Sequence, residues 1–159
     1  MSDPAHLAVG GVTLERAGAG DLDALQALQR AAYARNRERL GVEPLPLLAD
    51  YAQLLRTQEV WVVRDGAALA GAILLEPHGD HLLLWSIATA PARQGSGLGR
   101  ALLAATDARA RQLGLSQVRL YTGSPLSHLI AWYGRHGYAV THTETLPDRT
   151  ITHMAKRLD

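Results

Sequence analysis

The stretch Arg93-Gln94-Gly95-Ser96-Gly97-Leu98-Gly99-Arg100 carries the strongest structural signal in this chain. An apolar run at 82–88 precedes it and a run rich in alanine and leucine at 101–105 follows it, which predicts a strand, a loop and a helix. Three glycines on alternate positions clear side chains from the backbone and allow positive φ. The N-terminus of a helix attracts anions through its free N–H groups and its dipole. The stretch therefore predicts a phosphate-binding loop, with an arginine at each end.

Two familiar glycine patterns do not fit this loop. A dinucleotide-binding fingerprint that starts at Gly95 needs a third glycine where Arg100 stands, and one that starts at Gly97 needs it where the chain has leucine. A Walker loop also fails, because no Gly-Lys-Ser/Thr sequence follows at the required spacing. The pattern that does fit is Gln-x-x-Gly-x-Gly, formed by Gln94, Gly97 and Gly99.

Length and composition fit a single enzyme domain over residues 1–159. A chain of 159 residues that is 47% hydrophobic can bury one sizeable core. Its formal net charge of +1 provides no general attraction to nucleic acid or to an anionic membrane surface, so neither is expected as a partner. The lack of cysteine excludes disulfides, thiolate metal sites and a cysteine nucleophile. The seven histidines show no metal-ligand spacing, so no metal is expected.

The N-terminal stretch Met1–His6 has neither the basic region nor the apolar run of a signal peptide. No apolar run approaches the roughly 20 residues that a helix needs to span a bilayer. We therefore expect a cytoplasmic protein that does not enter the membrane.

The hydrophobic periodicity alternates between strand and helix patterns along the chain. Taken alone, it predicts an α/β or α+β sheet with helices on its faces. A polar, arginine-rich stretch follows the first helix, up to Gly41. Strands are expected at 12–16, 60–63, 69–76, 82–88, 118–122, 139–141 and 151–155, and helices at 21–33, 46–56, 101–113 and after Ser124.

The pattern of Gln94, Gly97 and Gly99 resembles the pyrophosphate-binding motif of the GNAT superfamily of acyl-CoA-dependent N-acetyltransferases. The residues at 87–91 also resemble the end of the family's preceding strand, with an apolar, a β-branched and a proline position. Downstream, Tyr133-Gly134-Arg135-His136-Gly137-Tyr138 resembles the family's Tyr-x-x-x-Gly-Phe/Tyr helix end. The order of the expected elements is similar to that of the family as well.

The resemblance implies the GNAT fold, a central mixed, mostly antiparallel sheet of about seven strands with helices on both faces, splayed between its fourth and fifth strands. It implies acetyl-CoA as cosubstrate and transfer of the acetyl group to a primary amine of a small molecule or peptide, by direct attack in a ternary complex. It leaves homodimer formation open. The alternative is a non-catalytic domain that binds acyl-CoA and regulates, which would share the glycine loop.

The same resemblance implies that the cofactor is held mainly by backbone groups. The pantetheine arm would lie in the splayed gap and the pyrophosphate on the loop amides, so that an unusual side chain in the loop is tolerated. The implied cofactor-binding residues are Ile87, Ala88, Thr89, Gln94, Gly95, Ser96, Gly97, Leu98, Gly99 and Arg100.

Tyr133 is the implied general acid, because it occupies the family's acid position four residues before Gly137. The thiolate leaving group needs a proton as the tetrahedral intermediate collapses, and a phenol with an ordinary pKa of about 10 stays protonated until then. The alternative is a tyrosine that only packs at a helix end, and the two motifs together favour the catalytic role.

The general base is where the sequence departs from the family pattern. Trp85 and Ser86 are expected to face the site on the central strand, and neither is a base. The remaining candidates are an ordered water and the side chains of His128, Glu144 and Glu38.

Two further groups of residues bear on the site. The turn residues Glu76, Asp80 and His81 are expected to be solvated at the far end of the hairpin from the glycine loop. The asparagine that often precedes the family's tyrosine is replaced, with Leu126 and Leu129 as candidates for its place.

The acceptor is expected to meet the segment between the first two helices and the last hairpin. Tyr33, Asn36, Arg37 and Arg39 fall in the first of these, and arginines suit an acceptor that carries a carboxylate. A solvated basic helix end is the alternative. Trp85 suits either an apolar wall of the acceptor pocket or the core.

Overall fold

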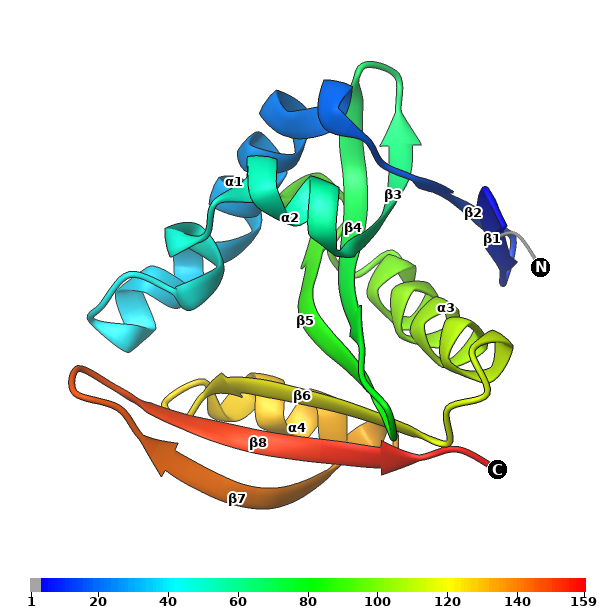
Figure 1. The fold of residues 1–159 in the computed structure, drawn as a ribbon. Helices are drawn as coiled ribbons and strands as arrows, with labels where there is room; N and C mark the ends of the chain where they lie inside the picture. Colours follow the sequence, from blue (N-terminus) through cyan, green and yellow to red (C-terminus); the bar gives the residue numbers. More distant parts are fainter. Residues whose placement is uncertain (1–3) are drawn as a thin grey trace.

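Eight strands form one sheet within residues 4–159, the part of the chain that the computed structural model describes (Figure 1). Their order is β1-β2-β3-β4-β5-β6-β8-β7, and every neighbouring pair is antiparallel except β5 and β6. Part of the N-terminal stretch interpreted above, residues 1–3, lies outside the described residues. The strands are β1 His6–Val9, β2 Val12–Arg16, β3 Glu59–Asp65, β4 Ala68–Pro77, β5 Leu82–Thr89, β6 Gln117–Gly123, β7 Ala139–Thr145 and β8 Thr150–Arg157.

The predicted mixed, mostly antiparallel sheet is confirmed, with one strand more than expected. The additional strand, β1, pairs with β2 through a hairpin at Gly10 and Gly11, both of which have positive φ. Only Leu7 of its four residues is buried. A strand this short and this exposed shows no alternation of apolar and polar residues that sequence could reveal.

Four α-helices and three short 3-10 helices belong to the same described residues. The first α-helix is longer than expected, because the arginine-rich stretch continues it until Gly41 adopts a left-handed φ of 71°. The second expected helix is divided into a 3-10 helix and a short α-helix. The elements are α1 Leu22–Leu40, α2 Tyr51–Thr57, α3 Leu98–Gln112, α4 Ser127–Arg135, η1 Ala19–Asp21, η2 Leu45–Leu48 and η3 Pro91–Arg93.

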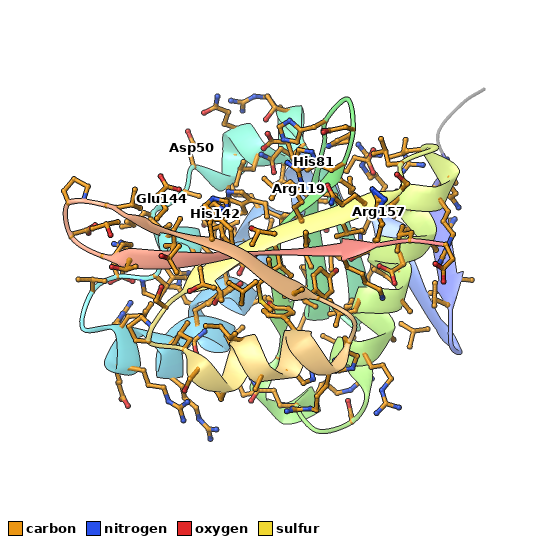
Figure 2. All side chains as sticks on the ribbon, turned by 90° about the horizontal axis from the view of Figure 1, so that it is seen from below. Asp50, His81, Arg119, His142, Glu144 and Arg157 are labelled. Atoms are coloured by element: carbon orange, nitrogen blue, oxygen red, sulfur yellow. The ribbon has the colours of Figure 1, made fainter. Side chains whose placement is uncertain are left out.

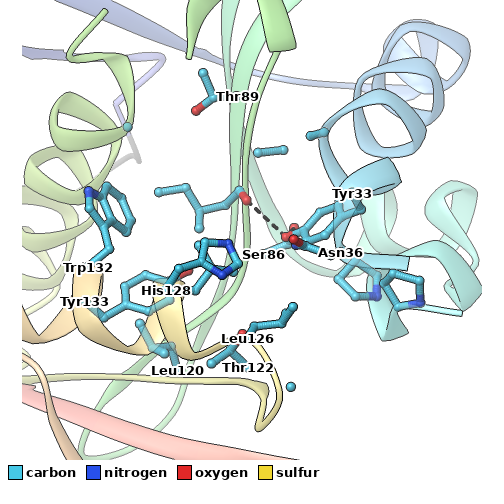
Figure 3. Close-up of a pocket in the computed structure, with 18 of the residues that line it drawn as sticks. Tyr33, Asn36, Ser86, Thr89, Leu120, Thr122, Leu126, His128, Trp132 and Tyr133 are labelled. Carbon is cyan, nitrogen blue, oxygen red and sulfur yellow. Dashed lines mark hydrogen bonds between the residues drawn. The ribbon is translucent and has the colours of Figure 1, made fainter. Parts of the chain in front are cut away.

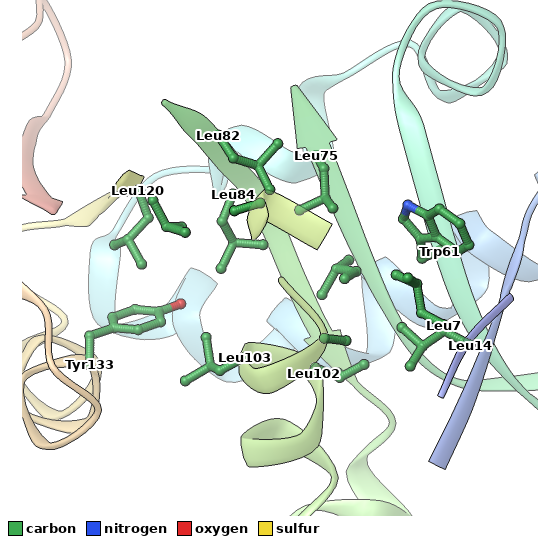
Figure 4. Close-up of a cluster of buried hydrophobic side chains, with 14 of the residues drawn as sticks. Leu7, Leu14, Trp61, Leu75, Leu82, Leu84, Leu102, Leu103, Leu120 and Tyr133 are labelled. Carbon is green, nitrogen blue, oxygen red and sulfur yellow. The ribbon is translucent and has the colours of Figure 1, made fainter. Parts of the chain in front are cut away.

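Each face of the sheet packs against its own apolar layer, because side chains alternate between the two faces along a strand. One layer joins the sheet to α3 and α4 and includes Leu84, Leu102 and Tyr133 (Figure 4). The other joins the sheet to α1 and α2 and includes Leu25 and Tyr51. The expectation of helices on both faces is therefore confirmed.

The strands β5 and β6 part soon after they begin. They pair only at Leu82 with Val118 and at Leu83 with Arg119, and Figure 1 shows them diverging from there. The other side of β5 stays paired with β4. Residues 84–89 therefore present an open backbone edge to the gap, which confirms the predicted splay between the strand before the glycine loop and the next strand.

A β-bulge changes the direction of the side chains in β5. The register with β4 shifts between Leu74 and Leu75, which leaves Trp85 as an extra residue. Before the bulge, Leu84 packs in the α3 layer, whereas after it Ser86 hydrogen-bonds to residues of α1. After the bulge, the side chain of Ser86 therefore points toward α1, on the opposite face of the sheet from α3.

A buried ion pair fixes α3 against β3. Arg109 donates from Nε and Nη2 to the two carboxylate oxygens of Glu59 at 2.8 and 2.9 Å, and Trp61 Nε1 donates to the same carboxylate at 3.0 Å. Removal of either side chain would break this contact between opposite charges in a buried place, which is costly to stability. The pair therefore joins the C-terminal half of α3 to β3.

Candidate active site

A cavity of about 660 Å³ opens where β5 and β6 part (Figure 3). Its walls come from α1, the segment 44–46, β5, the glycine loop, β6, α4 and the turn before β8. Its volume is that of a small-molecule site. Among the described residues that line it, none is an aspartate or glutamate, and the charged or titratable nitrogen bases are Arg35, Arg39, Arg100, Arg135, Arg149, His128 and His136.

The glycine loop forms one end of this cavity. Gly95 and Gly97 have φ of 79° and 88°, and no atom lies within 4 Å of a Cβ built on either. These two glycines are therefore required by the backbone conformation and not by crowding. Gly97 directly precedes α3, so the free N–H groups of the first helical turn belong to this end of the cavity.

Gly99 is required for a different reason, which is the position of Trp132. A Cβ atom at Gly99 would lie 3.2 Å from the indole ring. Trp132 packs in turn against His136, with ring centroids 4.8 Å apart. The C-terminal half of α4 therefore lies against the glycine loop.

Eight of the ten residues predicted to bind the cofactor line the cavity, and two do not. Leu98 is buried in the core, and Ser96 turns its hydroxyl back to the carbonyl of Arg93. The side chains of Leu98 and Ser96 need not face the cavity if this loop binds its ligand through main-chain groups. The eight that line the cavity are Ile87, Ala88, Thr89, Gln94, Gly95, Gly97, Gly99 and Arg100.

Two carbonyls of the open β5 edge accept hydrogen bonds from side chains. Tyr33 donates to the carbonyl of Ile87 at 3.0 Å, and Gln94 Nε2 donates to that of Thr89 at 3.4 Å. The Tyr33 hydroxyl also lies 2.9 Å from Ser86 Oγ. Burial raises the pKa of the Tyr33 phenol, although its hydrogen bonds oppose this. A ligand that pairs with this edge would share or replace the contacts of Tyr33 and Gln94.

Tyr133 lies on the α4 wall of the cavity, opposite Tyr33 and Asn36 in Figure 3. Its side chain is 6% exposed, and its ring packs edge-on against Tyr138 with centroids 5.8 Å apart. No side chain or carbonyl within residues 4–159 hydrogen-bonds to its hydroxyl. Burial raises the pKa of the Tyr133 phenol, and the phenols of Tyr33 and Tyr138 add to the shift. The group therefore stays protonated at neutral pH and can donate to a bound molecule.

Of the three side chains considered as a base, only His128 lines the cavity. Glu38 is exposed on α1, and Glu144 lies on β7, where its Oε1 is 2.9 Å from His153 Nε2. Figure 2 looks onto β7 and β8 and labels Glu144 and His142, both of which lie on β7.

His128 is held by Arg39, whose Nη1 lies 2.6 Å from the imidazole Nδ1. Because a guanidinium can only donate, Nδ1 accepts this hydrogen bond and the neutral ring carries its proton on Nε2. Burial, followed by the charge of Arg39, lowers the pKa of His128. The imidazole is therefore neutral at neutral pH.

The turn between β4 and β5 lies away from the cavity, as expected. His81 Nδ1 lies 2.7 Å from Asp80 Oδ1, and His78 Nε2 lies 2.9 Å from Glu76 Oε1. None of these side chains lines the cavity. Leu126 and Leu129, the candidates for the replaced asparagine, both line it and make that part of its wall apolar.

The α1 end of the cavity brings together three of the four residues expected to meet the acceptor. Tyr33, Asn36 and Arg39 line it at intervals of about one helical turn, whereas Arg37 points elsewhere and pairs with Glu43 at 2.7 Å. Asn36 is only 9% exposed, and no hydrogen-bond partner for its amide exists within residues 4–159.

Trp85 serves both roles that the sequence allowed. It lines the cavity, and it also packs edge-on against Tyr51 of α2 with centroids 6.4 Å apart. Tyr121 of β6 lines the same region.

Arg149, in the turn between β7 and β8, is a lining residue that the sequence does not predict. Its Nη1 donates to the carbonyl of Glu43 at 2.7 Å, and its Nη2 donates to Asp148 at 2.9 Å. Its side chain is 7% exposed and lines the cavity. The contact with Glu43 joins residues 106 positions apart, and no local pattern signals it.

Within residues 4–159, no group of three or more histidine, aspartate or glutamate side chains is arranged to hold a metal ion. None of the helices in this described part combines the length and the apolar character that crossing a membrane requires.

Comparison with protein families and known sequences gives consistent matches. The model of the acetyltransferase (GNAT) family matches residues 22–138. A curated mycothiol acetyltransferase from Pseudarthrobacter chlorophenolicus is 33% identical over 132 residues, which cover 74% of this chain. The match covers 39% of that relative, so the chain spans about two fifths of its length.

Solved structures share the fold at lower identity. The PaiA N-acetyltransferase from Thermoplasma acidophilum, solved in complex with coenzyme A, matches with a TM-score of 0.72 at 18% identity and covers 91% of this chain and 97% of its own. The ribosomal-protein-S18-alanine N-acetyltransferase from Escherichia coli matches with a TM-score of 0.71 at 19% identity, covering 92% and 93%. These likenesses show the fold.

Proposed function

Because this chain belongs to the GNAT acetyltransferase family, we propose that it transfers an acetyl group from acetyl-CoA to a primary amine of a small molecule or peptide. Both substrates would bind together in a ternary complex. The observation that carries the proposal is one cavity that joins the glycine loop, the open edge of β5 and the phenol of Tyr133. Each of the three meets one requirement of acyl transfer from a thioester to an amine.

The glycine loop and β5 would hold the cosubstrate. The main-chain N–H groups around Gly97 suit a pyrophosphate, and Arg100 adds positive charge beside them. The open edge at Ile87 and Thr89 suits the amide groups of a pantetheine arm. Binding of this kind orients the thioester, which can lower a bimolecular barrier by several kcal/mol, up to roughly 7–11.

The acceptor amine attacks the thioester carbonyl carbon, so that a C–N bond forms and the C–S bond breaks. The leaving thiolate takes its proton from Tyr133, which burial keeps in the protonated form. The amine must lose a proton as well. Since no carboxylate occurs among the described lining residues, this proton goes to water or to His128, or the amine arrives neutral.

The alternative is a non-catalytic domain that senses acyl-CoA. Such a domain would not need a proton donor such as Tyr133 next to the thioester. Release of free thiol from acetyl-CoA, followed with a panel of amines, separates the two functions. We expect thiol release that depends on the amine and is matched by formation of the acetylated amine. Tight binding of acetyl-CoA without thiol release from any amine would support the sensor instead.

A further inference from the structure

Besides Arg35 of α1 and Arg149 in the turn before β8, the cavity is lined by arginines near the two ends of α4. Arg100 and Arg135 lie toward the glycine loop, whereas Arg39 contacts His128 in the first turn of the helix. His128 and Arg135 are seven residues apart, which corresponds to about 10 Å along a helix. The contact of Arg39 with His128 therefore lies at the opposite end of α4 from Arg135.

Asn36 indicates that the Arg39 end of the cavity accommodates a polar ligand. Its side chain is more than nine-tenths buried, lines the cavity and has no hydrogen-bond partner among residues 4–159. Figure 3 shows it beside Tyr33, on the opposite wall from Tyr133. Its amide is not among the fully buried polar atoms without a partner, so it reaches the space of the cavity, where water or a bound molecule can complete its hydrogen bonds.

The contact that holds Arg39 is one that a carboxylate ligand would replace. Arg39 donates to a neutral imidazole nitrogen, and both side chains are exposed at the mouth of the cavity. A carboxylate is the stronger partner, because it accepts two parallel N–H groups of a guanidinium and carries the opposite charge.

We propose that the acceptor is an amine that also carries a carboxylate, and that this carboxylate binds Arg39 and Asn36 in place of His128. The inference rests on the proposed function and names its acceptor class. Once Arg39 turns to the carboxylate, His128 Nδ1 loses its donor and can accept the proton that the attacking amine releases. The exposed imidazole then returns that proton to solvent. A polycationic amine, by contrast, would meet a lining whose charged side chains are all positive.

Matched pairs of amines test the acceptor class. The probes are 4-aminobenzoate with 4-aminobenzamide, glycine with glycinamide, and β-alanine with β-alaninamide, and kcat/KM is expressed per neutral amine. We expect a carboxylate to exceed its amide by about 10- to 100-fold, as charge-assisted hydrogen bonds provide. Arg39→Ala removes this preference. Arg37→Ala is the matched control and keeps it, because Arg37 pairs with Glu43 outside the cavity lining.

Equal kcat/KM within every pair would overturn the assignment, as would a preference that survives in Arg39→Ala. Turnover of cationic amines alone would overturn it too.

A second measurement does not depend on turnover. ¹⁵N NMR of His128 reports which ring nitrogen carries the proton and whether Nδ1 accepts a hydrogen bond. Addition of 4-aminobenzoate should shift the ¹⁵N resonance of Nδ1 to the value of an imidazole nitrogen that accepts no hydrogen bond. Addition of 4-aminobenzamide should leave this resonance unchanged. No response to any of the three carboxylates would overturn the proposal.

Calorimetry with acetyl-CoA on the same samples separates a failure of the proposed function from a failure of the proposed acceptor class. A protein that binds acetyl-CoA and shows no carboxylate response contradicts only the acceptor class. A protein that does not bind acetyl-CoA contradicts the proposed function, and the NMR response of His128 still decides whether Arg39 binds a carboxylate.

Discussion

Trp132 occupies the space beside Gly99, where a Cβ atom would lie 3.2 Å from its indole ring. The same indole packs against Tyr133, with ring centroids 5.2 Å apart. One side chain therefore joins the loop assigned to the pyrophosphate and the tyrosine assigned to the leaving group. A substitution at Gly99 is expected to act through α4 as well as through the loop.

Gly99→Ala should weaken acetyl-CoA binding by about 1–3 kcal/mol, because the added methyl group overpacks against Trp132. In Gly99→Ala combined with Trp132→Leu, the smaller side chain should relieve this cost, so the two changes should be coupled in a double-mutant cycle. Gly97→Ala is the contrast, since its cost comes from a φ of 88° with no side chain in the way. Calorimetry gives the four dissociation constants. Additive effects of the Gly99 and Trp132 changes would contradict the role of the indole.

Tyr133→Phe should lower kcat by about 10²- to 10⁴-fold and leave the acetyl-CoA dissociation constant nearly unchanged, because it removes only a late proton donor. Tyr138→Phe is the matched control, since its hydroxyl is buried without a partner among the described residues. That control should keep kcat and be neutral or slightly stabilising. An unchanged rate in Tyr133→Phe, with chemistry shown to limit turnover, would assign Tyr133 to packing.

Weak amines should be acetylated faster than strong amines at neutral pH, because no carboxylate lines the described cavity. An amine with a pKa of about 10.4 is only about one part in a thousand neutral near pH 7.4. While Arg39 contacts His128, the lowered pKa of the imidazole makes it a weak base, so an acceptor without a carboxylate should show this difference in full. Profiles of kcat/KM against pH for a weak and a strong amine should converge as pH rises. Equal, pH-independent values from about pH 6 to 9 would reveal a dedicated base.

Arg39→Ala should raise the pKa of His128 toward its ordinary value of about 6.5, because the guanidinium charge adds to the effect of burial in lowering it. Burial remains in the variant, so the return should be incomplete. Titration of the imidazole by NMR measures the change, with Arg37→Ala as control. A shift of equal size in the control would show a general charge effect in place of the direct contact.

Glu59→Gln should destabilise the protein by up to about 3–5 kcal/mol, because the buried guanidinium of Arg109 loses the carboxylate charge that it contacts from Nε and Nη2. Urea unfolding measures this loss. Glu59→Leu combined with Arg109→Met should cost less than either single change. A single change within experimental error of wild type would show that the pair does not hold α3.

Stability should also depend on the ionisation of Glu59. Burial alone would raise the pKa of this carboxyl, but hydrogen bonds from Arg109 and Trp61 outweigh burial and lower it. Ionised Glu59 therefore adds to the free energy of unfolding at pH values above about 4.3, the pKa of glutamate in the unfolded chain. This stabilisation is lost as pH falls below that value. Glu59→Gln should flatten this part of the profile of unfolding free energy against pH.

The parts of the site that could be predicted are those that form short, continuous sequence motifs. The glycine loop is a continuous motif, and Tyr133 precedes Gly137 at a fixed spacing, so both could be predicted together with the strands on either side. Helical phase, however, depends on where a helix ends. Arg37 and Arg39 look equivalent in sequence, and only the continuation of α1 to Leu40 directs one to Glu43 and the other to the cavity.

The contacts that connect distant segments could not be predicted. Arg39 meets His128 across 89 positions, and Trp132 explains a glycine in another element. Such contacts arise because α1 and α4 pack around the splayed strands. No short stretch of sequence predicts this packing. The departure of this chain from its family at the base is likewise visible in sequence. Only the fold shows that, of the three side chains considered as a base, His128 lines the cavity.

The proposed function requires that the glycine loop and the open edge of β5 bind acetyl-CoA, and titration calorimetry with acetyl-CoA measures this binding. We expect one site with a dissociation constant in the low-micromolar range, about −8 kcal/mol, and loss of that site in Gly97→Val, with folding checked by circular dichroism. The absence of acetyl-CoA binding by the intact wild-type protein would contradict the account.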